Sequence, residues 1–279
     1  MKVKFPKRAA FVMLSAVIPA FMSSCGGKTG ISVVVAGSTS VQPYVEMLAE
    51  EYELLCPGIV VDIQGGGSSA GVTAVESRTA DVGMSSRELN EKERELWSTV
   101  IAKDGLALIA HPDNPVDNLA IGQIRDIYSG KITNWRELNG ADAKIHIISR
   151  EEGSGTRSAF EDMVMAGEPV TPKAIVQNSN GAVRLLVSND PNAVGFISLG
   201  LIGNQAGLKP VKALKLDGVS PTRENVINGG YSLYRPFLLV AESEPEGAAK
   251  LFVDFILSEE GQRLLVEEGL VSVREGTGE

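Results

Sequence analysis

Three segments of the chain repeat one local design, in which a short apolar run ends in a loop of glycine and hydroxyl residues and a helical pattern follows. The loops are Gly37-Ser-Thr-Ser, Gly67-Ser-Ser-Ala-Gly and Gly153-Ser-Gly-Thr. Continuous β-branched runs, such as residues 31–36, are typical of strands that are buried on both faces of a parallel sheet. Strands that alternate with helices predict an α/β fold, and this pattern constrains the architecture more than any other feature of the chain.

The same alternation continues along the sequence. We expect strands at residues 31–36, 59–64, 80–84, 106–110, 144–149, 194–198, 211–216 and 231–241. We expect helices at residues 41–55, 70–77, 90–97, 121–129, 181–188 and 246–268, and one that follows the third loop and reaches Ala166. Short strand-loop-helix units favour a mainly parallel sheet. The proline-rich segment at residues 111–115 ends a strand and marks a hinge between two α/β lobes.

The three loops have the chemistry of an anion-binding site. Glycine lets the backbone approach a ligand closely, and the first N–H groups of a helix have no partner within the helix. A helix N-terminus also carries partial positive charge, which favours a bound anion. Serine and threonine hydroxyls add further donors. In α/β sheets such loops gather at the carboxyl ends of the strands.

A single loop of this kind has a simpler explanation, because serine and threonine are the preferred helix N-caps. Three loops on one chain, one of them next to an arginine at a strand end, favour a binding site. Arg150 directly precedes the third loop. Its guanidinium offers planar, bidentate donors to two oxygens of an oxyanion. The alternative for Arg150 is a surface ion pair with Glu151 or Glu152.

The N-terminus has the layout of a bacterial secretory signal. Four basic residues precede an apolar run at residues 9–22, and small residues lead into Cys25. These residues resemble a lipobox, so residues 1–24 are expected to be removed and Cys25 acylated, with residues 25–30 as a tether. The alternative is an ordinary cleaved signal with an incidental cysteine. Cys56 is then the one remaining thiol, which excludes an internal disulfide.

Charge and composition exclude several classes of function. Removal of residues 1–24 takes away four basic groups and no acidic ones, so the net charge changes from −9 to −13. Nucleic acid binding needs a basic surface, which this composition does not provide. Two histidines without a cysteine-histidine cluster do not indicate a metal site. We expect no cofactor, and an anion must be bound here by local donors against the overall field of the protein.

Several motifs together resemble the phosphate-binding component of the bacterial phosphate ABC importer. They are Gly37-Ser-Thr-Ser, Gly66-Gly-Ser-Ser-Ala-Gly, Asp81-Val-Gly-Met-Ser-Ser-Arg-Glu-Leu, Ile127-Tyr-Ser-Gly-Lys-Ile-Thr-Asn-Trp, Ser149-Arg-Glu-Glu-Gly-Ser-Gly-Thr-Arg, Pro221-Thr-Arg-Glu-Asn and Ser232-Leu-Tyr-Arg-Pro. The resemblance covers residues 31–273 in order. It implies a type II-like periplasmic-binding-protein fold, in which phosphate binds between two lobes that close by a hinge motion. Lobe 1 is expected at residues 31–112 and 231–279, and lobe 2 at residues 113–230.

The resemblance also implies a set of site residues and partners. The residues carried over by motif are Thr39, Ser40, Ser68, Ser86, Arg150, Ser154, Gly155 and Thr156, supported by Ser38, Ser69 and Glu152. Glu152 is expected to pair with Arg150, whereas Tyr128 and Trp135 are expected to pack inside a lobe. The implied role is a monomeric, exported, lipid-anchored receptor that has no catalytic activity. It delivers phosphate to a permease with two transmembrane subunits and an ATPase.

Ser86 is a departure from part of the family. Some members carry an aspartate there, which accepts the proton of hydrogen phosphate and rejects fully deprotonated sulfate. A serine hydroxyl donates or accepts, so it discriminates less between the two anions. Other members also carry serine, and phosphate remains the expected ligand. The alternatives within binding proteins are sulfate, molybdate and tungstate.

A different class of function, a serine hydrolase, remains as an alternative. Gly67-Ser-Ser-Ala-Gly fits the pattern of a nucleophile elbow with Ser69 at its centre. A catalytic triad needs a histidine base that a carboxylate orients. His146 follows in the sequence, but the late part of the chain, the usual position of the base, has no histidine. The hydrolase interpretation would also leave the other two loops without a purpose.

Overall fold

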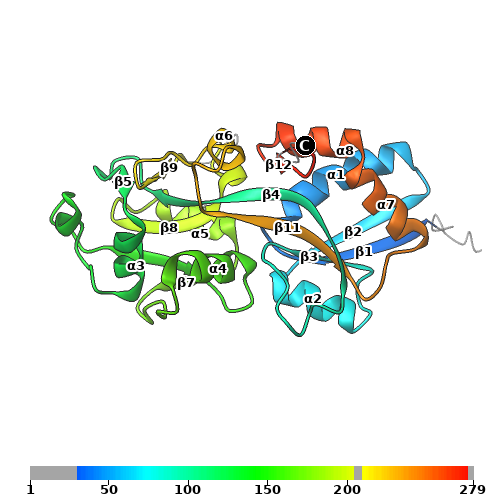
Figure 1. The fold of residues 1–279 in the computed structure, drawn as a ribbon, viewed down its shortest axis with the longest axis horizontal. Helices are drawn as coiled ribbons and strands as arrows, with labels where there is room; N and C mark the ends of the chain where they lie inside the picture. The colour runs from blue at the N-terminus through cyan, green and yellow to red at the C-terminus, as the bar shows by residue number, and fades with distance from the viewer. Residues whose placement is uncertain (1–29, 204–208, 276–279) are drawn as a thin grey trace, which may run out of the picture.

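A computed structural model describes residues 30–203 and 209–275 of the chain. The expected signal peptide, Cys25 and nearly all of the tether lie outside these residues. The described part forms two α/β lobes that lie side by side along the long axis (Figure 1). Ten of the described strands join in one sheet with the core order β2-β1-β3-β11-β4-β8-β6-β7. The predicted two-lobe α/β class is confirmed.

Lobe 1 is a short sheet with helices on both faces. Its elements are β1 (Ile31–Gly37), α1 (Gln42–Leu55), β2 (Ile59–Gly65), α2 (Ser68–Glu76), β3 (Val82–Ser85), α7 (Gly247–Leu257) and α8 (Glu259–Glu267). Helices α1, α7 and α8 cover one face, and α2 covers the other (Figure 1). β1 pairs in parallel with β2 and with β3, so the loops after these strands open at the same edge.

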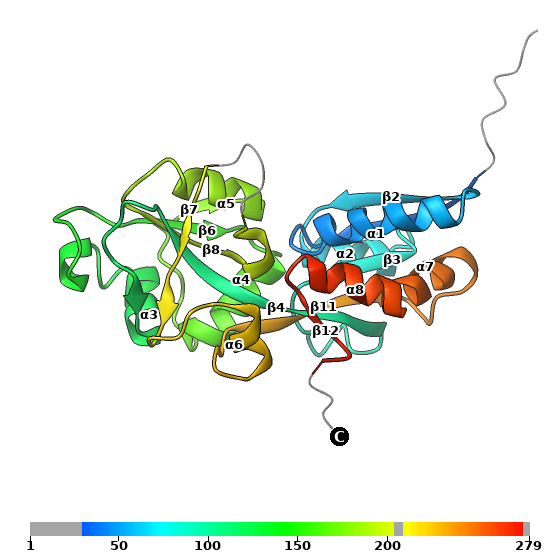
Figure 2. The ribbon, with the colours of Figure 1, turned by 90° about the horizontal axis from the view of Figure 1, so that it is seen from above.

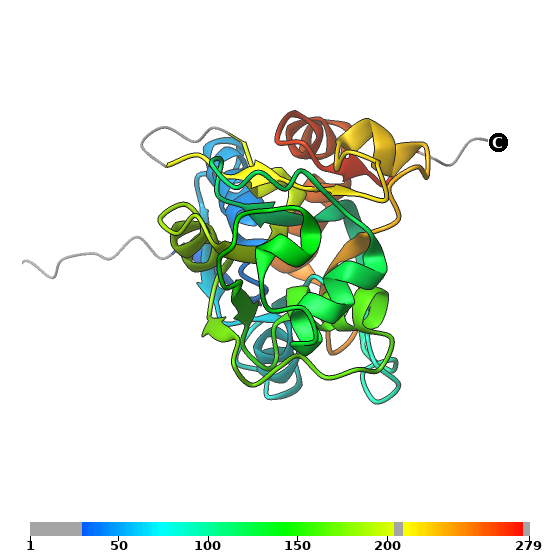
Figure 3. The ribbon, with the colours of Figure 1, turned by 90° about the vertical axis from the view of Figure 1, so that its left-hand side faces the viewer.

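Lobe 2 repeats this arrangement. Its main elements are α3 (Ile121–Ser129), β6 (His146–Arg150), α4 (Gly155–Phe160), β7 (Ile175–Gln177), α5 (Asn180–Val187) and β8 (Ala193–Ser198). Shorter elements complete it: β5 (Asn118–Leu119), β9 (Lys212–Ala213), β10 (Lys215–Leu216) and α6 (Arg223–Ile227). β6 pairs in parallel with β7 and β8. Figure 3 shows this lobe from its own end of the molecule, with lobe 1 behind it.

Two long strands connect the lobes. β4 (Trp97–Ala110) and β11 (Tyr234–Ala241) run antiparallel, and Figure 2 shows them side by side between the lobes. Ala102 belongs to the core of lobe 1, whereas Leu106, four residues further along β4, belongs to that of lobe 2. We call β4 and β11 the crossing strands. Because both pair antiparallel with their neighbours, the sheet is mixed and not mainly parallel as predicted.

Two predicted helices differ from the structure. Residues 90–97 form turns and the start of β4, because a buried ion pair between Arg87 and Glu93 folds this segment back. The long helix at residues 246–268 is divided into α7 and α8. Ser258 has extended backbone at the break, and its hydroxyl accepts a hydrogen bond from the N–H of Gly261 at 3.2 Å. An N-cap therefore starts a second helix within one amphipathic pattern.

The core of lobe 2 is aromatic. The rings of Phe160 and Phe196 stack with their centroids 4.2 Å apart, and Tyr128 packs against both. Trp135 is buried and donates its indole N–H to the carbonyl of Asn192 at 2.9 Å. The predicted structural roles of Tyr128 and Trp135 are confirmed. In the described part of the chain, no helix has both the length and the apolar character to cross a bilayer.

Candidate anion-binding site

Four hydroxyl-rich loops meet between the lobes. They follow β1 (Ser38, Thr39, Ser40), begin α2 (Ser68, Ser69), follow β3 (Ser86) and begin α4 (Ser154, Gly155, Thr156). Direct contacts join the two lobes here: Ser40 Oγ lies 2.8 Å from Thr156 Oγ1. The N–H of Ser69 donates to the carbonyl of Gly153 at 3.1 Å. The loops that the sequence singled out therefore converge from both sides of the interface.

Lobe 1 contributes a chain of three buried hydroxyls. Ser38 Oγ donates to Ser86 Oγ at 2.9 Å, and Ser86 Oγ lies 3.4 Å from Ser68 Oγ. Ser68 Oγ also accepts the backbone N–H of Ser86 at 3.0 Å. All three side chains are at most 2% exposed. Ser68 Oγ therefore uses one of its two lone pairs on this N–H, and its hydrogen points either to Ser86 Oγ or to a ligand.

Lobe 2 contributes the N-terminus of α4. Ser154 is the N-cap, and its hydroxyl accepts the N–H of Arg157 at 3.3 Å. The N–H groups of Gly155 and Thr156 occupy the first helical positions, where helix geometry offers no backbone acceptor. The absence of a side chain at Gly155 matters for the contact with lobe 1. A Cβ atom there would lie 2.2 Å from Ser68 Oγ and 2.6 Å from Ser86 Oγ.

Arg150 is the charged centre of this region. It is the last residue of β6, and its side chain is 1% exposed. Its guanidinium donates to Thr39 Oγ1 of lobe 1 at 3.2 Å and to the carbonyls of Gln177 and Asn178. Nη1 makes a single long contact among the described residues, 3.5 Å to Thr156 Oγ1. This nitrogen therefore has the most donor capacity left for a ligand.

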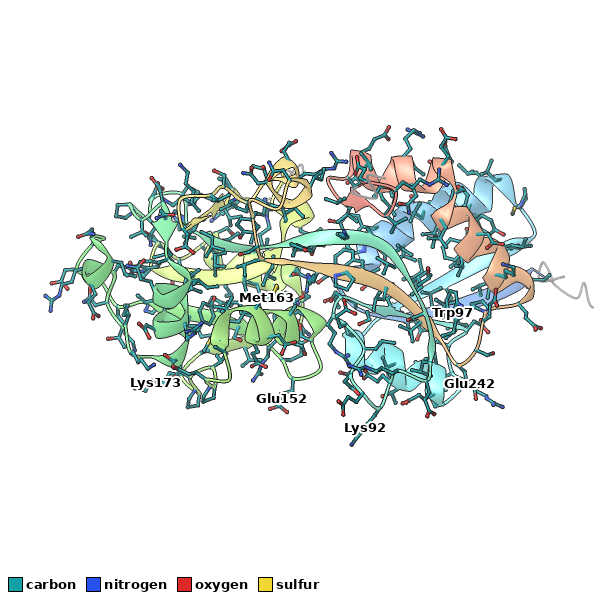
Figure 4. The ribbon with its side chains drawn as sticks, in the orientation of Figure 1. Lys92, Trp97, Glu152, Met163, Lys173 and Glu242 are labelled. Atoms are coloured by element: carbon teal, nitrogen blue, oxygen red, sulfur yellow. The ribbon has the colours of Figure 1, made fainter. Side chains whose placement is uncertain are left out.

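The partner of Arg150 differs from the prediction. Glu151, and not Glu152, binds Arg150 in a bidentate pair, with contacts of 2.9 and 3.0 Å. Glu152 is exposed and points away from the body of the protein at the lower edge of Figure 4. Glu151 Oε1 lies near Gly67 of the second loop, whereas Glu152 begins the turn that leads into the third. The predicted pairing of Glu152 with Arg150 is therefore wrong.

Ser69 contacts lobe 2 through its backbone and not through its hydroxyl. Its N–H forms the contact with Gly153, whereas its hydroxyl accepts a long hydrogen bond of 3.4 Å from Arg87. His146 lies at the opposite end of β6 from Arg150 and pairs with Asp190 at 2.6 Å. His111 Nδ1 accepts the N–H of Asp113. Neither histidine can therefore act as a base for Ser69, and the hydrolase interpretation lacks the histidine of a catalytic triad.

A polar cluster behind the first loop was not predicted. Asp104 and Arg235, from the two crossing strands, form an ion pair at 3.0 Å that is almost completely buried. Arg235 Nη2 also donates to Ser40 Oγ at 3.2 Å, and Asn180 Nδ2 donates to the same oxygen at 2.8 Å. Ser198 Oγ donates to Asp104 Oδ1 at 2.7 Å. These residues come from distant parts of the chain, and apart from Ser40 only Arg235 lies in one of the motifs named above, Ser232-Leu-Tyr-Arg-Pro.

Burial shifts both charges of this cluster toward their neutral forms. It raises the pKa of the Asp104 carboxyl, and the charge of Arg235 and the hydrogen bond from Ser198 act in the opposite direction. Burial likewise lowers the pKa of the Arg235 guanidinium, which Asp104 partly offsets. Removing either partner would leave a buried charge without compensation. Groups of three or more histidine, cysteine or acidic side chains that could hold a metal do not occur within residues 30–203 and 209–275.

Comparison of the chain with known proteins identifies its family. A family model described as a PBP superfamily domain matches residues 23–260. The phosphate-binding protein PstS of Bacillus subtilis is 31% identical over 252 residues, which span 88% of this chain and 82% of that protein. The expected family is therefore confirmed.

Solved structures agree with this result. A Clostridium perfringens chain, described as a phosphate ABC transporter substrate-binding protein with bound phosphate, superimposes with a TM-score of 0.82 and 43% identity. The match covers 87% of this chain and all of that one. An ABC-type phosphate transport receptor from Vibrio cholerae matches with a TM-score of 0.71 and 38% identity, covering 86% of this chain and 99% of the receptor.

The contact at Gly155 gives a first test. With saturating phosphate, the anion expected from the sequence, Gly155→Ala should hold the lobes apart, because its Cβ would overlap Ser68 Oγ and Ser86 Oγ. Small-angle X-ray scattering should give a larger radius of gyration than for the parent protein. Gly122→Ala is the matched control, since a Cβ there meets no atom within 4 Å. Equal scattering by the Gly155 variant and the parent would contradict this view of the interface.

Proposed function

The chain belongs to the PBP superfamily, within it to the PstS family of phosphate-binding proteins, and from this premise we propose that it captures inorganic phosphate outside the cytoplasmic membrane and delivers it to an ABC permease. One observation supports the proposal most strongly. A buried guanidinium, Arg150, lies where hydroxyl loops from both lobes meet, and its Nη1 is hardly used by the protein. The role is binding and release without catalysis.

The proposed ligand contacts come from both lobes. Arg150 supplies a charge-assisted donor, and the first-turn N–H groups of Gly155 and Thr156 supply the field of a helix N-terminus. The hydroxyls assigned to the phosphate oxygens are those of Thr39, Ser40, Ser68, Ser86 and Thr156, with Ser38 and the cap residue Ser154 in support. Because the donors belong to two lobes, bound phosphate favours the closed arrangement.

Charge balance is consistent with capture of an anion by an acidic protein. Arg150 is paired with Glu151, and Arg235 is paired with Asp104. The carboxylates of Glu151 and Asp104 are thus each paired with an arginine, which balances their negative charge. Binding then depends on many oriented donors more than on net charge.

The ligand preference is the first point to test. In isothermal titration, phosphate should bind with a Kd in the micromolar range or tighter, and excess sulfate should give no response. Arg150→Ala should weaken phosphate binding by about 30-fold or more, since loss of one partner of a buried charged contact costs about 2–5 kcal/mol. Circular dichroism should show that this variant keeps its fold.

Two outcomes would contradict the proposal. Equal binding of sulfate and phosphate would remove the specificity for phosphate and favour a general receptor for tetrahedral oxyanions. Unchanged phosphate affinity in Arg150→Ala would remove this residue from the site.

Delivery to a permease requires the receptor to stay near the membrane. We propose that Cys25 is acylated after removal of residues 1–24 and that the monomeric protein is held at a membrane surface by this anchor. The permease would consist of two transmembrane subunits with a cytoplasmic ATPase. The apolar run before Cys25 and the small residues next to it support this proposal.

The anchor is tested by fractionation of cells that express the protein. Cys25→Ala should move the protein from the membrane fraction to the soluble fraction, because the acylated side chain is lost. Cys56→Ala is the matched control, since Cys56 is a free thiol that packs against the core of lobe 1. Retention of the Cys25 variant in the membrane fraction would contradict acylation at this residue.

A further inference from the structure

The hydroxyl of Ser40 accepts two hydrogen bonds, so toward any further partner it can act only as a donor. Its side chain is 1% exposed and lies between the two lobes. Asn180 Nδ2 donates to Ser40 Oγ at 2.8 Å, and Arg235 Nη2 donates to it at 3.2 Å. A hydroxyl has two lone pairs and one hydrogen. Both lone pairs are therefore occupied, and the hydrogen must be donated.

The direction of the Asn180 contact is set by a backbone group. The N–H of Ser198 donates to Asn180 Oδ1 at 3.2 Å. A backbone N–H cannot accept, so this contact identifies the oxygen of the amide, and the amide nitrogen must face Ser40. Asn180 is 2% exposed, which keeps water from competing for these positions.

The Arg235 contact is held in place by Asp104. Nε and Nη2 of Arg235 both donate to Asp104 Oδ2, at 3.2 and 3.0 Å. Asp104 itself is fixed by the hydroxyl of Ser198 at 2.7 Å. The guanidinium also lies over the ring of Phe237, 5.4 Å from its centroid. Arg235 is thus positioned on the crossing strands with one N–H edge turned to the first loop.

We infer that Arg235 is a positioning residue for the proposed phosphate site and that, together with Asn180, it presets Ser40 as a hydrogen-bond donor to the ligand. The inference rests on the proposed function. Here Ser40 Oγ lies 2.8 Å from Thr156 Oγ1, which accepts its hydrogen. A phosphate oxygen that lies beside both hydroxyls would replace Thr156 as the acceptor of this hydrogen. A donor whose orientation is already fixed costs less to order on binding than one that rotates freely.

The arrangement also connects the site to closure of the lobes. Ser40 belongs to lobe 1, Arg235 to a crossing strand and Asn180 to lobe 2. When the lobes separate, Asn180 leaves Ser40, whereas Arg235 stays on the strand that pairs with β3 and β4. Only the closed arrangement therefore occupies both lone pairs of Ser40.

A double-mutant cycle tests the inference. Arg235→Lys keeps a positive charge near Asp104, but a single ammonium cannot reproduce the fork that reaches both Asp104 and Ser40. Isothermal titration of the purified protein should show phosphate affinity reduced by about tenfold in Arg235→Lys. In a Ser40→Ala background the same substitution should change the affinity by less than about twofold, since the two residues act through one contact.

The matched control is Arg184→Lys. Arg184 is a buried arginine of α5, 5% exposed, which donates to the carbonyls of Leu201 and Ile202 and contacts none of the loops of the site. Its substitution should leave the phosphate affinity unchanged. If Arg235→Lys does not fold, the double variant Asp104→Asn/Arg235→Gln removes both charges together, and its effect on affinity should likewise depend on Ser40.

The outcomes separate the inference from the proposed function. If the parent protein does not bind phosphate, the proposed function fails, and the inference fails with it. If the parent binds phosphate, the inference alone is overturned by either of two results. These are unchanged affinity in the Arg235 variant, or the same loss with and without Ser40.

Discussion

A buried oxyanion must be held by donors that are already oriented and whose own charges are already balanced. Water is excluded from such a site, so it can neither hydrogen-bond to the anion nor screen the charges. The region between the lobes meets this requirement with hydroxyl groups, helix N-termini and two buried arginines. Each arginine has a carboxylate of its own, Glu151 for Arg150 and Asp104 for Arg235. The hydroxyls are linked to one another, which limits the orientations that each of them adopts.

The crossing strands carry one of these balanced arginines, and they are also the part of the chain that joins the two lobes. β4 and β11 carry Asp104 and Arg235 at the place where the chain passes from one core to the other. The same strands form the joint about which two-lobe binding proteins close. The ion pair therefore lies where the chain crosses between the lobes, and Arg235 also donates to Ser40 of the first hydroxyl loop. In the proposed function, ligand binding and closure would share these hydrogen bonds, which would give the coupling between them a physical basis.

The site was predictable to the extent that its chemistry is local in the sequence. Glycine-serine loops after apolar runs marked the hydroxyls, and the strand end marked Arg150, because strand, loop and helix start follow within a few residues. The pairing with Arg150 was predicted for Glu152 and is made by Glu151, since two adjacent glutamates differ in orientation and not in type. Asp104, Arg235 and Asn180 were missed because their contacts span large separations, 131 residues for the ion pair. The available signals for Arg235 were its place in Ser232-Leu-Tyr-Arg-Pro and a charged residue at the start of an apolar strand.

In the fold, too, features set by local sequence were predictable and features set by long-range contacts were not. Alternating strands and helices predicted two α/β lobes, whereas the antiparallel crossing strands depend on long-range pairing that no local pattern shows. The segment at residues 90–97 is rich in helix-forming residues, yet the pairing of Trp97 with Ala241 extends β4 into it. Tertiary pairing overrides weak local propensity in such cases.

The most direct test of this account is a crystal structure of the protein with phosphate. We expect one phosphate between the lobes, with oxygens within hydrogen-bond distance of Arg150 and Thr156 from lobe 2 and of Thr39, Ser40 and Ser68 from lobe 1. Ser40 should keep its contacts with Arg235 and Asn180 and direct its hydrogen to the ligand. A phosphate bound by one lobe alone, or at a place remote from Arg150, would contradict the account.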